Sequence, residues 1–197
     1  FAHLAEGLKH ARDRHDRFRI KHLLTLTFAS QGRNDDALDM LLKAFRVLGR
    51  PLPRSGAAQL VVVAFLWVAA LAMRFTGLGY GRAQGEERER RRVLSQLHYA
   101  GSMIALFQGR PALMIQFIVR DFYNVHFLGA TAETAIALSV YGAVLGTFLL
   151  RSVMERFTRA GVEMAAALDD RAALAVCRAY QSMGTKWSGD LEHGNRL

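Results

Sequence analysis

Apolar residues recur at helical spacing along most of the chain, and short polar or glycine-containing stretches interrupt them. Leu24 and Phe28 belong to one such stripe, which ends at "QGRND", and a second stripe follows in "ALDMLLKAFRVLG". Apolar residues three and four positions apart share one face of a helix. Gly32 suits the left-handed backbone that ends a helix, and Pro51 prevents the second helix from continuing. The pattern therefore predicts two helices joined by a short turn.

The same pattern returns further along the chain. When Gly109, Leu149 and Gly189 are taken as equivalent turn positions, successive turns are 40 residues apart, and Gly32 precedes Gly109 by 77 residues, close to two such steps. No alternation typical of strands accompanies this pattern. A fixed period of helical hairpins predicts an all-α fold of stacked antiparallel helix pairs, a solenoid.

The first hairpin resembles the tetratricopeptide repeat. That motif has a large apolar residue, an aromatic residue, a turn glycine and small residues on the second helix, and this chain has Leu24, Phe28, Gly32, Ala37 and Ala44 at those places. The small residues allow close helix packing, and the large ones fill the groove of the next unit. The resemblance implies a right-handed, tetratricopeptide-like superhelix.

The third hairpin departs from the motif. It has Leu149 in place of the turn glycine, and Met154 and Gly161 in place of the two alanines, although Gly142 and Phe157 keep their motif types. We interpret it as a longer variant of the repeat.

A narrower resemblance comes from the segment after the first hairpin. "ALDMLLKAFRVLGRPLPRS", a hydrophobic helix, a basic and acidic run and "LSQLHYAGSMIALFQGRPAL" are similar to the helical repeat region of large bacterial signalling ATPases. In that group an ATPase module precedes such helices, and a class III nucleotidyl cyclase or protein kinase domain is often fused to it. We expect a first repeat hairpin with a preceding helix at 1–50, a proline linker with the hydrophobic helix and a Gly/Arg loop at 51–86, and further repeats at 87–197, the last one truncated.

The stretch 57–75, "AAQLVVVAFLWVAALAMRF", admits two interpretations. Its fully apolar part, Leu60 to Met73, is 14 residues long, which at about 1.5 Å per residue is shorter than the roughly 30 Å core of a bilayer. Arg54 and Arg74 flank it without an inside-outside bias. We therefore expect a helix buried among repeats. In the alternative, 57–75 and 129–150 anchor a small helical membrane protein.

Charge and cysteine content change this picture little. The formal net charge is +9, but the arginines are spread through every segment and many adjoin acids, so we interpret them as a solvated helical surface and expect no nucleic acid partner. Cys177, the single cysteine, fits a reducing compartment, and we expect a cytoplasmic location. The chain begins at Phe1 and ends in "DLEHGNRL", and we interpret it as a segment of a longer protein.

No catalytic constellation stands out. The histidines lack the helical spacing of a zinc pair, and "GLGYGRAQG" follows a helix and does not end in the Gly-Lys-Ser or Gly-Lys-Thr of a phosphate loop. We expect no catalytic residue, cofactor or metal in this segment. A weaker alternative is a helical enzyme that holds a lipid-like substrate among the methionine and aromatic residues of 103–127.

The expected function is a non-catalytic scaffold or regulatory region of a signalling ATPase. It would bind a protein partner or other domains of the same parent chain. In a helical solenoid the first helix of each hairpin lines the concave side. That geometry gives one candidate partner surface: Arg19, His22, Leu26, Gln96, Tyr99 and Met103.

Overall fold

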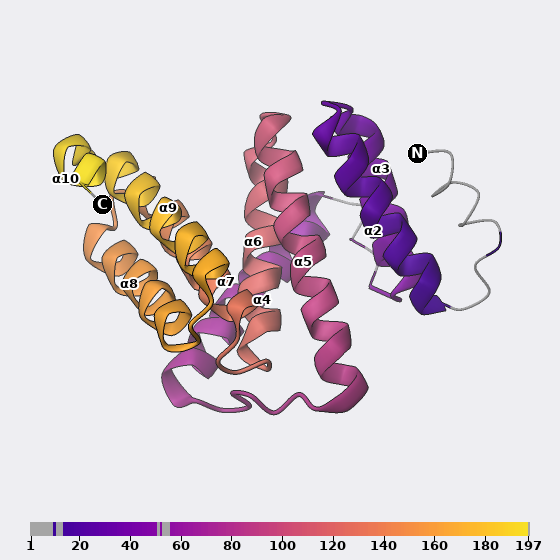
Figure 1. Cartoon of the computed structure of the whole chain (residues 1–197), viewed down its shortest axis with the longest axis horizontal. Coiled ribbons are helices and arrows are strands. Elements are labelled where there is room, and N and C mark those ends of the chain that lie inside the picture. The colour runs from indigo at the N-terminus through magenta and orange to yellow at the C-terminus, as the bar shows by residue number, and fades with distance from the viewer. Residues whose placement is uncertain (1–9, 11–13, 51, 53–55, 197) are drawn as a thin grey trace. The chain divides into compact units, whose positions relative to one another are not determined.

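The computed structural model describes residues 10, 14–50, 52 and 56–196, and all its regular elements are α-helices (Figure 1). In chain order they are α2 (Arg14–Ser30), α3 (Asn34–Val47), α4 (Gly56–Thr76), α5 (Gly85–Phe107), α6 (Pro111–His126), α7 (Ala132–Gly146), α8 (Arg151–Ala167), α9 (Arg171–Trp187) and α10 (Leu191–Arg196). The helices pack antiparallel in pairs, and the part of the chain described contains no strand. The all-α prediction is confirmed.

The chain divides into two compact units, which are described separately. The first contains residues 1–64 and 97–117, and the second contains residues 65–96 and 118–197. In the first unit α2 packs against α3. In the second unit α7 packs against both α8 and α9, and α9 also contacts α8 and α10. Each inner helix of the second unit therefore has neighbours on two sides.

The turns repeat one local structure. Gly32, Gly109, Leu149 and Gly189, the four predicted turn positions, all have a left-handed backbone, with φ of 71°, 64°, 59° and 93°. The amide that follows each turn residue donates to a carbonyl five residues earlier, as Arg33 does to Phe28 and Leu150 to Leu145. This bond closes a helix C-terminus in the Schellman manner.

The turns at the opposite ends of the hairpins also have a left-handed residue. Gly49, Gly129 and Asp169 have φ of 70°, 74° and 52°, and 129 and 169 lie midway between the predicted turns, so from residue 109 a left-handed residue recurs every 20 positions. A helix of about four turns between regularly spaced stops generates the hairpin series.

Small residues occur where helices cross closely. Ala37 and Ala44 on α3 are fully buried. A Cβ added to Gly161 on α8 would lie 2.2 Å from the Ser139 hydroxyl of α7, and one added to Gly142 would lie 2.8 Å from Thr158. Side chains larger than hydrogen would separate α7 from α8. The third hairpin thus has glycine, Gly161, at one of the two places where the first hairpin has alanine.

Aromatic side chains fill the core of each unit. In the first, Phe45 of α3 stacks on Phe117 with ring centroids 5.9 Å apart. In the second, the rings of Phe122 and Tyr141 stack at 4.2 Å, and Phe157 meets both edge-on. Such aromatic pairs contribute roughly 0.5–1.5 kcal/mol each beyond the area they bury.

The expectation that 57–75 is a buried helix is wrong. It forms α4, a helix of 21 residues, but almost none of Ala57–Thr76 is buried, and this stretch is long and apolar enough to cross a membrane. Within it, only Ala70 is a buried hydrophobic residue. The prediction assumed neighbours on both sides of an all-round apolar helix, whereas α4 has them on one side.

The second apolar segment, 129–150, contains α7, which is a core helix. Most of its side chains are buried, among them Leu138, Val140 and Leu145, and α8 and α9 cover it. Membrane attachment through this segment would require the hairpins of the second unit to separate. Only the first of the two segments in the membrane hypothesis is exposed.

Candidate interaction surface

One half of the α4 surface is apolar and exposed to solvent. We call the following exposed apolar residues of this helix the outward face of α4: Ala57, Leu60, Val61 and Ala64 in the first unit, and Phe65, Val68, Ala72 and Phe75 in the second. Their spacing of three and four positions places them on one side of the helix. Soluble proteins rarely leave a continuous apolar patch of this kind uncovered, so such a patch marks a site that meets a partner or a membrane.

Within the second unit, the opposite side of residues 65–76 of α4 contacts α7. The Trp67 indole N–H donates a hydrogen bond to the Tyr141 hydroxyl of α7. At the C-terminal end of the outward face itself, the Arg156 guanidinium of α8 lies 5.9 Å from the centre of the Phe75 ring. Burial raises the pKa of Tyr141, and the bond from Trp67 opposes this effect. The hydrogen bond from Trp67 turns this side of α4 toward α7. No pattern in the sequence predicts this pair.

The glycine-rich loop after α4 is closed by backbone hydrogen bonds. The Gly81 amide donates to the His126 carbonyl at 3.2 Å and the Ala83 amide donates to the Phe127 carbonyl at 2.9 Å. A Cβ on Gly129 would lie 2.9 Å from the Gly81 Cα, so the two backbones pack directly. A phosphate cradle needs free amides, and these two amides are already bonded.

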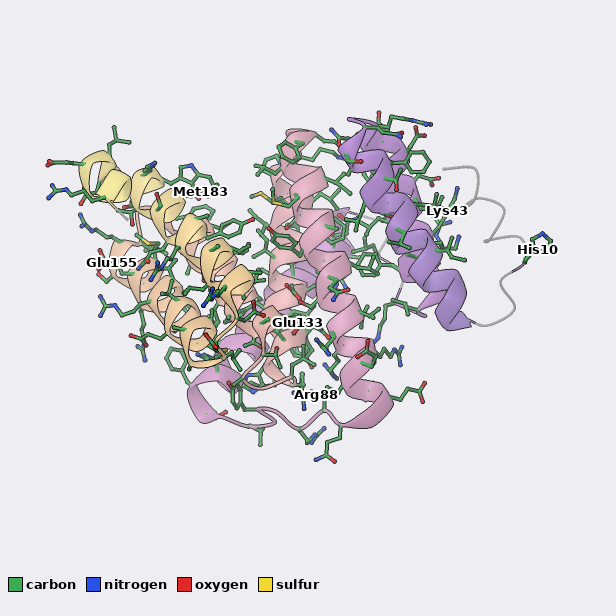
Figure 2. The ribbon with its side chains drawn as sticks, in the orientation of Figure 1. His10, Lys43, Arg88, Glu133, Glu155 and Met183 are labelled. Atoms are coloured by element: carbon green, nitrogen blue, oxygen red, sulfur yellow. The ribbon has the colours of Figure 1, made fainter. Side chains whose placement is uncertain are left out.

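A polar cluster joins α5, α6 and α7 within the second unit. The Arg92 Nε donates to a Glu133 carboxylate oxygen at 3.0 Å, and Asn124 donates from its amide to the Arg91 carbonyl at 2.7 Å. The hydrogen bond with Glu133 raises the pKa of Arg92. Glu133 is labelled in Figure 2. These contacts pin the N-terminal end of α5 to its neighbours.

Asp121 of α6 is the most deeply buried acid of this cluster. Burial raises its pKa well above the ordinary value, a hydrogen bond with Ser95 lowers it, and the charge of Glu133 raises it further. Sequence inspection did not identify Asp121 as special. The available signal was an acid within the otherwise apolar run "MIQFIVRDFYNVHF".

The remaining candidate groups have structural roles. Cys177 is buried with Ala135, Ala165 and Ala173, and burial raises the pKa of its thiol, which disfavours the reactive thiolate. Asp170 accepts a hydrogen bond from the Ala173 amide at 2.9 Å, as expected of a helix cap. Among the described residues no group of His, Cys, Asp and Glu side chains could hold a metal ion.

Equivalent turns of successive hairpins are linked by polar side chains. In the first unit Gln108 donates to Asp35 at 2.8 Å. In the second, Arg151 at the start of α8 pairs with Asp190 before α10 at 2.9 Å. A hydrogen bond with Glu155 raises the pKa of Arg151. Both links involve exposed groups, so they add little stability. They help to align one hairpin with the next.

The predicted concave surface stays a prediction. Leu26 of α2 and Gln96 of α5 are exposed, and Tyr99 and Met103 of α5 are half-buried. The side chains of Arg19 and His22 lie outside the described residues. Leu26, Tyr99 and Met103 belong to the first compact unit, and Gln96 belongs to the second.

No protein-family model, curated protein or solved structure matches this chain.

Proposed function

We propose that this chain is a tetratricopeptide-like scaffold or regulatory region of a larger signalling ATPase and has no catalytic role of its own. It would bind a protein partner or other domains of its parent chain in the cytoplasm. The observation that carries the proposal is the repeated turn. Left-handed residues recur every 20 positions from 109 to 189. At 109, 149, 169 and 189 the next amide donates to a carbonyl five residues earlier.

The packing of the second unit supports the same proposal. In a stacked repeat, the first helix of one hairpin contacts its own partner helix and the first helix of the next hairpin. The helix α7 meets α8 and α9 in this way. The small residues at the crossings, Gly142 and Gly161, match the close approach that the repeat requires.

The proposed binding surface is the row of first helices. Leu26, Tyr99 and Met103 are the residues of the predicted surface that lie in one unit, and each exposes part of its side chain. Partly exposed aromatic, leucine and methionine side chains are residue types that can bury a helix or loop of a partner.

The test starts with the complete reading frame that encodes this chain. We expect an ATPase module upstream, or a cyclase or kinase domain downstream, and we expect that domain, produced separately, to bind this chain in titration calorimetry. Tyr99→Ala with Met103→Ala should weaken binding at least about tenfold. The control is Leu168→Ala, an exposed leucine after α8. A reading frame without such domains would contradict the proposal, as would equal binding by all variants.

A further inference from the structure

The outward face of α4 needs an occupant that is apolar and long. The apolar helix Ala57–Thr76 has 20 residues, about 30 Å of helix. Its largest outward side chains are well exposed: Leu60 and Val61 by 70%, Phe65 by 69% and Phe75 by 71%. Covering them would remove several large apolar side chains from water. Burial of each one can strengthen binding up to about a hundredfold.

The residues that adjoin α4 in the sequence carry charges of one sign. From Val47 to Gly85 the sequence contains no aspartate or glutamate, while four basic residues occur there. They are Arg50, Arg54, Arg74 and Arg82. Basic residues beside a long apolar face complement a bilayer whose headgroups are anionic, since each one near such a surface adds to the attraction.

The same charges disfavour a second copy of the chain as the occupant. A symmetric pair formed through α4 would bring two sets of these basic flanks together, and like charges at close range repel. The contacts of α4 also disfavour a membrane-spanning arrangement. One side of the helix is tied to α7 through Trp67 and Tyr141, and a spanning helix would lose that contact.

We propose that the outward face of α4 docks in the plane of an anionic lipid bilayer. The side chains of Phe65, Val68 and Phe75 enter the boundary between headgroups and acyl chains, and Arg74 and Arg82 contact the headgroups. The protein stays folded and keeps the hydrogen bond between Trp67 and Tyr141. This inference does not depend on the scaffold proposal, since the two concern different surfaces.

The experiment uses the full chain and two kinds of vesicle, one of phosphatidylcholine and one of phosphatidylcholine mixed with phosphatidylserine. Cosedimentation should show binding to the mixed vesicles, with at least about tenfold less binding to the neutral ones and a loss of binding as salt is added. Equal binding to both kinds, or no binding to either, would overturn the proposal.

Matched variants separate this face from general stickiness. Phe65→Ser should weaken vesicle binding at least about tenfold. Phe107→Ser should leave it unchanged, although Phe107, at the end of α5, is exposed by 71%, nearly the same as Phe65. Melting curves of both variants should match the parent, because neither side chain is buried. An equal loss of vesicle binding in both variants would overturn the proposal. A dimer of the parent chain that dissociates in Phe65→Ser but not in Phe107→Ser would also overturn it.

The depth of insertion is read from Trp67. In Trp187→Phe protein, Trp67 is the remaining tryptophan of the two in the chain. Because Trp67 lies on the side of α4 that faces α7, in-plane docking keeps it outside the acyl chains, and lipids brominated near the headgroup should quench its fluorescence more than lipids brominated near the acyl terminus. Stronger quenching from the acyl terminus would show a spanning helix and overturn in-plane docking.

Discussion

The carboxylic acid of Asp121 lies buried on α6, where an ionised form is costly. Its pKa is raised, chiefly by burial, so the folded chain binds the proton more tightly than the unfolded chain. The stability that this proton contributes is fully present below the unfolded value of about 3.9 and is lost as pH rises through the folded pKa. For one proton the slope cannot exceed about 1.4 kcal/mol per pH unit.

Asp121→Asn keeps the shape of the side chain and a hydrogen-bonding group for Ser95, but it cannot ionise. We expect the variant to be more stable than the parent at neutral pH and to lose less stability as pH rises from 4. Urea unfolding at several pH values measures both effects. Asp39→Asn, an exposed acid that pairs with Lys43, is the control and should follow the parent. Parallel pH profiles for Asp121→Asn and the parent would contradict the assignment.

At the scale of elements, the turns separate what spacing can predict from what it cannot. Leu149 was assigned to a turn by its 40-residue distance from two glycines, and its φ of 59° confirms that assignment. A leucine pays a steric cost there that glycine does not. The closing bond at this turn, from Leu150 to Leu145, is 3.4 Å, against 2.9 Å at Gly109. The leucine turn is therefore the weaker of the two.

Reciprocal substitutions test this equivalence. Leu149→Gly should stabilise the protein by about 0.5–1 kcal/mol, because relief of the left-handed strain exceeds the added entropy of the unfolded chain. Gly109→Leu should destabilise it by about 1–2 kcal/mol. Leu149 is largely exposed, so little packing is lost. Thermal melting of both variants provides the measurement, and shifts of the same sign would contradict the shared role.

Several features lie beyond sequence periodicity for physical reasons. An all-round apolar helix has no polar side to mark solvent, so the exposure of α4 could not be predicted from its pattern. The approach of Gly81 to Gly129 is set by packing between segments distant in sequence. The bond between Trp67 and Tyr141 joins residues 74 positions apart. Turns and close crossings follow from local residue types, whereas these contacts depend on tertiary structure.

At the scale of the whole molecule, the glycine-rich loop does not combine the groups that nucleotide hydrolysis requires. Hydrolysis of a nucleotide needs an amide cradle, a lysine on the phosphates and acidic metal ligands. The glycine-rich loop has committed the amides of Gly81 and Ala83 to carbonyls of the α6 end. Lys43 pairs with Asp39 on α3, and Lys186 lies in the last turn of α9. Neither lysine belongs to the loop.

We therefore expect the purified chain, with magnesium or manganese and ATP or GTP, to release no more phosphate or cyclic nucleotide than a heat-treated sample. Arg82 is the basic side chain of the loop itself, so Arg82→Ala serves as the internal control for trace activity. A contaminant would act equally in the parent and in Arg82→Ala preparations. Turnover that survives repurification and disappears in Arg82→Ala would contradict the prediction, because it would require the loop to open its backbone bonds and bind phosphate.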